Sequence, residues 1–92
     1  MKVDIVTPEG ALFSGDIDAV VVPSINGSFE ILNNHAPIIA VLEKGQIRLK
    51  GKGILIDESV ADKFIIEQNE VRLPIHSGTV EMKNNKVIIL AE

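Results

Sequence analysis

TVEMKNNKVIILA, residues 79–91, has the pattern of a β-hairpin. Polar and apolar residues alternate over residues 79–83, as in a half-buried strand, and residues 86–91 are almost continuously apolar, as in a buried strand. Asn84 and Asn85 stand between the two segments, and asparagine tolerates the left-handed backbone conformation that a tight hairpin turn needs. The stretch therefore predicts two antiparallel strands joined by a short turn.

The same alternation recurs along most of the chain, at residues 2–7, 16–22, 47–50 and 71–75. We expect Pro23 to end the second of these strands, because proline has no N–H to donate to a sheet. Turn-forming residues separate the segments at intervals of roughly eight to twelve residues, which is typical of all-β proteins. The sequence thus predicts an all-β fold, a sandwich or flattened barrel of two antiparallel sheets with about ten short strands.

Length and composition limit the class of protein. The 92 residues predict one domain, residues 1–92. The chain has no cysteine, so disulfides and thiolate metal sites are excluded, and its formal net charge of −4 argues against nucleic acid as a partner. The first residues lack a signal-peptide core, and no apolar run approaches the roughly 20 residues of a membrane-spanning helix. We therefore expect a cytoplasmic protein that meets a membrane only through other proteins.

The residues that could take part in catalysis form no recognisable motif. They are two histidines, one serine and three acids: His35, His76, Ser77, Asp16, Asp18 and Glu30. His76 and Ser77 are neighbours on a predicted strand, so their side chains should point to opposite faces. The chain has no nucleophile elbow, no phosphate-binding glycine loop and no metal-ligand spacing. The sequence therefore predicts a protein that is not an enzyme and holds no metal or cofactor.

The segment GSFEILNNHAPI, residues 27–38, differs most from its surroundings. Pro37 fixes its own φ angle and favours an extended conformation at Ala36, which makes the segment stiff. Three apolar residues before the polar tip are expected to anchor it to the core, namely Phe29, Ile31 and Leu32. A stiff loop with a polar tip suits a recognition surface. The residues alone leave open an ordinary crossing between two sheets.

Six segments in order resemble a known family. They are Thr7–Gly10, Leu12–Gly15, Val20–Pro23, Gly27–Ile38, Leu42–Arg48 and Gly78–Glu92. Together they resemble the N-terminal β-sandwich of the epsilon subunit of F-type ATP synthase, over residues 1–50 and 77–92. The chain departs from the family pattern at Ser28, where an acid is usual, at Glu30, where glycine is usual, and at Asn33, where proline is usual.

Two further differences from the family pattern concern length. Residues 51–76 are longer than the usual stretch, so we expect an extra or extended hairpin there. The two C-terminal helices common in the family, which carry inhibition and in some members ATP binding, have no counterpart in this sequence. The resemblance therefore implies neither of those roles.

The resemblance implies a noncatalytic subunit of the central stalk that joins the gamma subunit to the membrane c-ring. Such a subunit turns with its partners, so that proton or sodium flow drives ATP synthesis elsewhere in the complex. It would lie at the cytoplasmic face of a bacterial inner membrane. The residues that match the ring-facing part of the family are Ser28, Glu30, Asn34 and His35, and those that match the gamma-facing edge are Pro37, Ile39 and Ala40.

Two other functions remain open at this point. A free-standing β-sandwich that binds a small molecule or carbohydrate would show a concave apolar pocket with convergent polar groups. The absence of tryptophan and tyrosine argues against a sugar-binding platform. An enzyme would place His35 or His76 beside an acid in a cleft.

Overall fold

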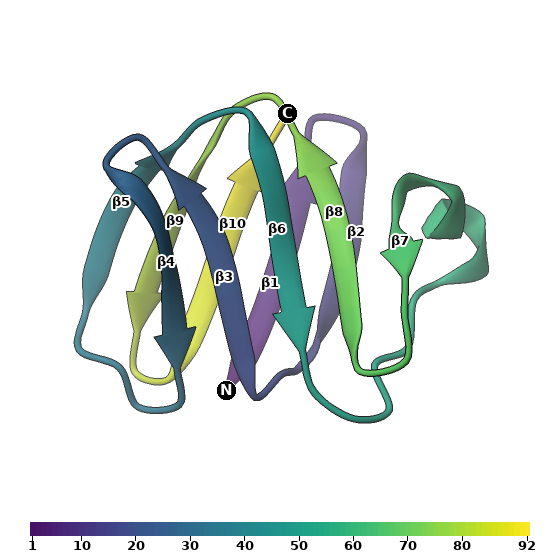
Figure 1. Cartoon of the computed structure of the whole chain (residues 1–92), viewed down its shortest axis with the longest axis horizontal. Helices are drawn as coiled ribbons and strands as arrows, with labels where there is room; N and C mark the ends of the chain where they lie inside the picture. Colours follow the sequence, from purple (N-terminus) through teal and green to yellow (C-terminus); the bar gives the residue numbers. More distant parts are fainter.

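The computed structural model describes residues 1–92 and contains ten strands and one 3₁₀ helix. In chain order these are β1 (Lys2–Thr7), β2 (Gly10–Asp16), β3 (Ala19–Ser24), β4 (Gly27–Leu32), β5 (Ile38–Leu42), β6 (Gly45–Lys50), η1 (Glu58–Lys63), β7 (Ile65–Ile66), β8 (Glu70–Ile75), β9 (Gly78–Lys83) and β10 (Lys86–Ala91). The strands lie in two layers that face each other (Figure 1). We call the layer β2–β1–β10–β9–β5 sheet I and the layer β4–β3–β6–β8–β7 sheet II.

The two sheets are joined by hydrogen bonds at one corner, where β5 of sheet I meets β3 of sheet II. Ser24 and Leu42 are the only residues paired between these strands. Next to them, the Glu43 N–H donates to the Pro23 carbonyl at 2.8 Å. The sandwich is therefore one curled sheet that folds over at this corner.

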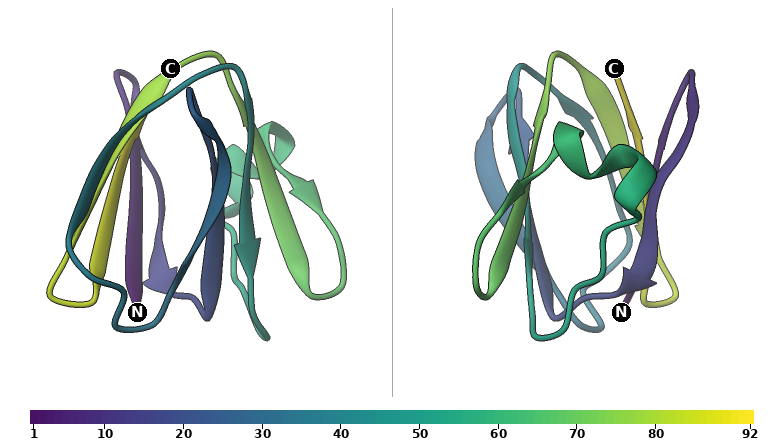
Figure 2. Two further views of the ribbon diagram at one scale, coloured as in Figure 1. Left: turned by 60° about the vertical axis from the view of Figure 1, so that its left-hand side comes forward. Right: turned by 90° about the vertical axis from the view of Figure 1, so that its right-hand side faces the viewer.

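The helix η1 closes the opposite side of the sandwich, between the two layers (Figure 2). Phe64, which follows it, is buried, and Val60 packs against the core. Asp57 caps the helix by accepting a hydrogen bond from the Ser59 N–H at 2.8 Å. No helix in the structure combines the length and apolar character needed to cross a membrane.

The strands bury alternate residues in a single cluster of 21 hydrophobic side chains. In β8 the buried residues are Val71, Leu73 and Ile75. The same alternation in the other strands turns one face of each sheet inward. The period-two pattern of the sequence therefore determines which side chains form the core.

The predicted fold class is confirmed, with one difference in strand direction. All pairings are antiparallel except that of β1 with β10, which is parallel from Lys2↔Lys86 to Val6↔Leu90. The predicted hairpin at residues 79–91 is confirmed as β9 and β10, and Asn84 and Asn85 adopt φ angles of 52° and 58°.

Three local predictions need correction. Pro23 does not end its strand: β3 continues to Ser24, because the Pro23 carbonyl still accepts a hydrogen bond at the corner. His76 and Ser77 lie in the bend between β8 and β9 and not on a strand. The expected hairpin in residues 51–76 is formed only by the two-residue strand β7 against β8, and the rest of that region holds η1.

Gly78 lies where β9 and β10 approach each other closely, and a substitution there can test this close approach. A Cβ atom at this position would lie 2.4 Å from the Leu90 carbonyl oxygen, so Gly78→Ala must displace backbone. We expect this variant to lose about 1–3 kcal/mol of unfolding free energy in urea titrations. Gly51→Ala is the matched control, because its Cβ would meet nothing closer than 3.5 Å and stability should not fall. Equal stability of the two variants would contradict the close approach.

Candidate functional site

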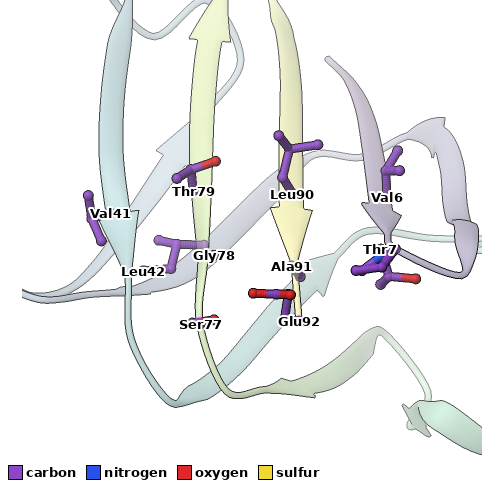
Figure 3. Close-up of a pocket in the computed structure, with 11 residues that line it drawn as sticks. Val6, Thr7, Val41, Leu42, Ser77, Gly78, Thr79, Leu90, Ala91 and Glu92 are labelled. Carbon is purple, nitrogen blue, oxygen red and sulfur yellow. The ribbon is translucent and has the colours of Figure 1, made fainter.

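The outer face of sheet I carries exposed apolar side chains beside a few charged ones. Ile39 is 77% exposed, Val41 54% and Leu90 53%. The strand register places Val41, Thr79, Leu90 and Val6 in one row across four strands, and Figure 3 shows these four side chains along the sheet. A second row contains Ile39, Glu81, Ile88 and Asp4. We call the apolar members of the two rows, with Thr79, the apolar face: Val6, Ile39, Val41, Thr79, Ile88 and Leu90.

A shallow groove of about 560 Å³ lies at one end of the apolar face (Figure 3). Val6, Val41 and Leu90 contribute to its lining, and the polar groups around it come from Thr7, Ser77, Thr79 and Glu92. The groove is open to solvent along its length. A small-molecule site usually encloses its ligand, so this shape fits the side chain of a protein partner better.

The outer face of sheet II is charged and internally paired. Arg48 donates to Glu70 at 2.8 Å, and Lys50 donates to Glu30 at 3.0 Å. The hydrogen bond from Arg48, aided by its positive charge, lowers the pKa of the Glu70 carboxyl, and the same bond raises the pKa of Arg48. The two outer faces therefore differ in degree: ion pairs dominate sheet II, whereas sheet I has one weaker pair, Lys86–Asp4 at 3.9 Å, and leaves Ile39, Val41 and Leu90 more than half exposed.

The turn after β4 is fastened to neighbouring parts of the fold. The His35 N–H donates to the Leu32 carbonyl at 3.1 Å, and Asn34 has a φ angle of 63°. The Asn34 N–H donates to the Asn85 side-chain oxygen at 2.7 Å, and the Asn33 side-chain oxygen accepts from the Met1 nitrogen. These contacts support the prediction of a stiff loop.

Two of the three predicted anchors of this loop face the core. Ile31 is fully buried and Phe29 is half-buried against the core. Leu32 is exposed, so its predicted role as an anchor is wrong. The reason is its position in β4, since the residue after an inward-facing Ile31 points outward.

The four predicted ring-facing residues are all exposed but do not form one cluster. Ser28 and Glu30 lie on β4, which pairs only with β3, whereas Asn34 and His35 lie beyond the end of that strand. Four residues of extended chain separate Ser28 from Leu32, or about 13 Å. The set therefore follows the free edge of β4 from one end of the sandwich to the other.

The three predicted gamma-facing residues point in different directions. Pro37 and Ile39 are exposed, and Ile39 belongs to the apolar face. Ala40 is half-buried and packs against the core, because it alternates with Ile39 along β5. The inner side chain of Ala40 therefore does not belong to the outer surface.

Most of the apolar face does not follow from the sequence patterns. The apolar run at residues 86–91 predicts a buried strand, whereas only Val87, Ile89 and Ala91 are buried and Leu90 and Ile88 lie outside. The available signal is the apolar run itself, because in a protein of alternating strands it places apolar side chains on the outer face as well.

The candidate catalytic residues are not brought together. No hydrogen bond joins the side chains of His76 and Ser77, which are both exposed. The ring of His35 hydrogen-bonds to the Ala36 carbonyl at 2.7 Å and to no carboxylate. No group of three or more histidine, aspartate or glutamate side chains is placed to hold a metal ion.

The Arg48–Glu70 pair should make the free energy of unfolding fall as the pH becomes acidic. Since the pKa of folded Glu70 is lowered, its ionised form stabilises the fold above the ordinary glutamate pKa of about 4.3, and this contribution is lost as pH falls through the lowered pKa. We expect Glu70→Gln to lower the unfolding free energy at pH 7 and the difference from wild type to shrink below about pH 4. Urea unfolding over a pH series measures this, with Glu9→Gln, an exposed acid without an ion pair, as control. A difference that does not vary with pH would contradict the ion-pair effect.

Comparison with known proteins matches this fold and its sequence to one family. The family model of the β-sandwich domain of the ATP synthase delta/epsilon chain matches residues 1–62. The chain is 37% identical to the ATP synthase epsilon chain of Chlorobium limicola over 91 residues, which cover 99% of this chain and 88% of that protein. It is 36% identical to the epsilon chain of Alkalihalophilus pseudofirmus over 92 residues, which cover 100% of this chain and 58% of that protein.

A solved structure gives the same result for the fold. The central stalk and c-ring structure of the Tetrahymena thermophila mitochondrial ATP synthase contains a chain similar to this one, with a TM-score of 0.71 and 17% identity. The match covers 99% of this chain and 62% of that chain. The family resemblance is thus confirmed, and the chain belongs to the delta/epsilon family of ATP synthase chains.

Proposed function

We propose that this chain is a noncatalytic central-stalk subunit of F-type ATP synthase that joins a gamma subunit to a c-ring. Family membership supports a place in that membrane-associated complex, and the similar solved chain comes from a structure of a central stalk and c-ring. The observation that carries the proposal is the apolar face of sheet I. A subunit that transmits rotation needs a broad, stable contact of this kind.

The apolar face is assigned to the gamma subunit. It presents Ile39, Val41 and Leu90 with more than half of each side chain in water, whereas isolated soluble domains rarely leave contiguous apolar surface of this kind uncovered. Burying one such side chain contributes about 1.5–3 kcal/mol, so covering three of them stabilises a complex by several kcal/mol. Pro37 extends this surface at the start of β5, and Ala40 supports it from the core side.

The free edge of β4 and the turn after it are assigned to the c-ring. Ser28, Glu30, Asn34 and His35 supply exposed hydroxyl, carboxylate, amide and imidazole groups along this strip. Glu30 is already paired with Lys50 at 3.0 Å, so a polar loop of the ring would share or replace that surface ion pair. An exposed pair of this kind is worth at most about 1 kcal/mol, which makes the exchange easy.

The mechanical role follows from packing. The core contains 21 buried side chains in one cluster, and closely packed interiors deform little under load. In this role the domain turns with gamma and the ring, and proton or sodium flow through the membrane drives ATP synthesis in other subunits. The bacterial relatives favour the cytoplasmic face of a bacterial inner membrane.

A charge placed in the apolar face tests the gamma assignment. Leu90→Asp should weaken binding to purified gamma subunit at least about tenfold, because a carboxylate would be buried among apolar side chains. Leu55→Asp, at an 86% exposed residue outside the apolar face, is the matched control and should bind normally. Calorimetry gives the affinities and circular dichroism confirms folding. Equal affinity of the two variants would contradict the assignment.

Site-directed cross-linking tests the ring assignment. Because the chain has no cysteine, Ser28→Cys and His35→Cys each introduce a single thiol. In the assembled complex both should cross-link to a ring subunit, and Ile39→Cys should cross-link to gamma. Mass spectrometry identifies the partner peptides. Cross-linking of His35→Cys to gamma alone would confine the ring contact to the Ser28 end of β4, and failure of both at the ring would refute the assignment.

A further inference from the structure

Asn85 connects three segments that are distant in sequence. It lies in the turn between β9 and β10, with its side chain half-buried. Its side-chain oxygen accepts from the Asn34 N–H at 2.7 Å, across a separation of 51 residues. Its backbone carbonyl accepts from the Lys2 N–H at 3.2 Å, at the start of β1. Asn85 thus joins the β9–β10 turn to the start of β1 on one side and to the loop after β4 on the other.

We propose that Asn85 is a positioning residue that holds the Asn34–His35 turn at a fixed angle to the apolar face. This inference rests on the proposed function, in which the turn and the apolar face meet rotor partners. Asn85 touches neither partner in this proposal. It acts through Asn34, whose backbone it fixes.

The geometry of the turn explains why it needs a second attachment. The His35 N–H closes the turn on the Leu32 carbonyl, so this bond fixes the shape of the turn but not its tilt relative to the rest of the fold. The Asn34 N–H, at a residue with a φ angle of 63°, leaves the turn and bonds to Asn85. The Asn33 side-chain oxygen already ties the turn to the Met1 nitrogen, and the bond from Asn34 to a separate hairpin adds the second restraint on its tilt.

The hydrogen bond from Asn34 to Asn85, which we call the tether, also couples the two proposed contact surfaces. The hairpin that carries Asn85 continues into β10, which carries Ile88 and Leu90 of the apolar face. A turn that leaves its fixed orientation must be reordered when a partner binds. The measured affinity then falls in proportion to the fraction of molecules that hold the competent orientation.

Asn84 supplies a matched control within the same turn. Asn84 and Asn85 have nearly the same left-handed conformation, with φ angles of 52° and 58°, and glycine accepts that conformation without strain. Only the Asn85 side chain bonds to the loop. Asn84→Gly and Asn85→Gly therefore make the same backbone change, and only the second removes the tether. Asn85→Asp keeps an oxygen acceptor at that place.

The experiment combines two measurements on the full chain. Amide hydrogen exchange of Asn34, followed by nuclear magnetic resonance in the free protein, reports the tether without any partner. Affinity for a purified complex of gamma and c-ring reports its consequence. A net hydrogen bond of ordinary strength predicts about two- to tenfold faster exchange of Asn34 in Asn85→Gly, and an affinity loss of similar size. Asn84→Gly and Asn85→Asp should resemble wild type in both measurements, and thermal unfolding checks that every variant is folded at the temperature of the measurements.

A double variant with Glu30→Trp and His35→Trp serves as the reference for the proposed function, because its bulky side chains should block the loop contact directly. Unchanged Asn34 exchange in Asn85→Gly overturns the tether. Faster exchange with unchanged affinity, while the double variant binds weakly, overturns the positioning role and leaves the proposed function intact. Unchanged affinity in both Asn85→Gly and the double variant overturns the loop contact and the positioning role together. Faster exchange with weaker binding, absent from the two controls, supports the inference.

Discussion

The parallel pairing of β1 with β10 is the constraint on which both the core and the outer surface depend. It joins the first strand to the last across the whole length of the chain, from Lys2↔Lys86 to Val6↔Leu90. On the inner side it sets Val3 and Ile5, both fully buried, beside the equally buried residues of β10. On the outer side it sets Val6 beside Leu90 and so widens the apolar face. Without this pairing, β10 would become a free edge and the hairpin of β1 and β2 would lose its attachment to the sandwich.

The same alternation of residues gives the two sheets outer faces of different chemical character. Sheet II pairs its charges internally, as in Arg48–Glu70 and Lys50–Glu30, and surface pairs of this kind contribute little energy. Sheet I leaves Val41 and Leu90 in water, and covering either side chain contributes more than a surface ion pair does. The magnitudes therefore favour sheet I as the surface for the proposed gamma contact, whereas the paired charges of sheet II, such as Glu30, suit the weaker polar contact proposed for the ring.

Local patterns in the sequence predict local structure well. The hairpin at residues 79–91 follows from alternation and from two adjacent asparagines, and the fold class follows from the repetition of such segments. The parallel partner of β1 does not follow, because nothing within residues 2–7 specifies a strand more than 80 residues away. The same limit applies to Pro23, whose carbonyl bond depends on where β5 turns back onto β3.

The candidate site is less predictable than the fold, because its surfaces combine distant segments. The stiff loop follows from Pro37 and its neighbours, but the bond from Asn34 to Asn85 spans two loops whose meeting depends on the closed sandwich. The apolar run in β10 is visible in the sequence, yet which of its residues face outward depends on register, since a shift of one residue exchanges the two faces. Alternation alone indicates that Ile39 and Ala40 cannot both lie outside.

In the proposed role, the turn after β4 passes mechanical load into both sheets. His35 is followed after two residues by β5, which carries Ile39 and Val41. β5 pairs with β9 at every residue from Ile38 to Leu42, but with β3 at one residue only. A force applied at the turn therefore passes into β9 and β10 through a continuous ladder of hydrogen bonds and through the side chain of Asn85. Sheet II receives the force directly as well, because the turn begins after Leu32 and β4 pairs with β3 at every residue from Gly27 to Leu32.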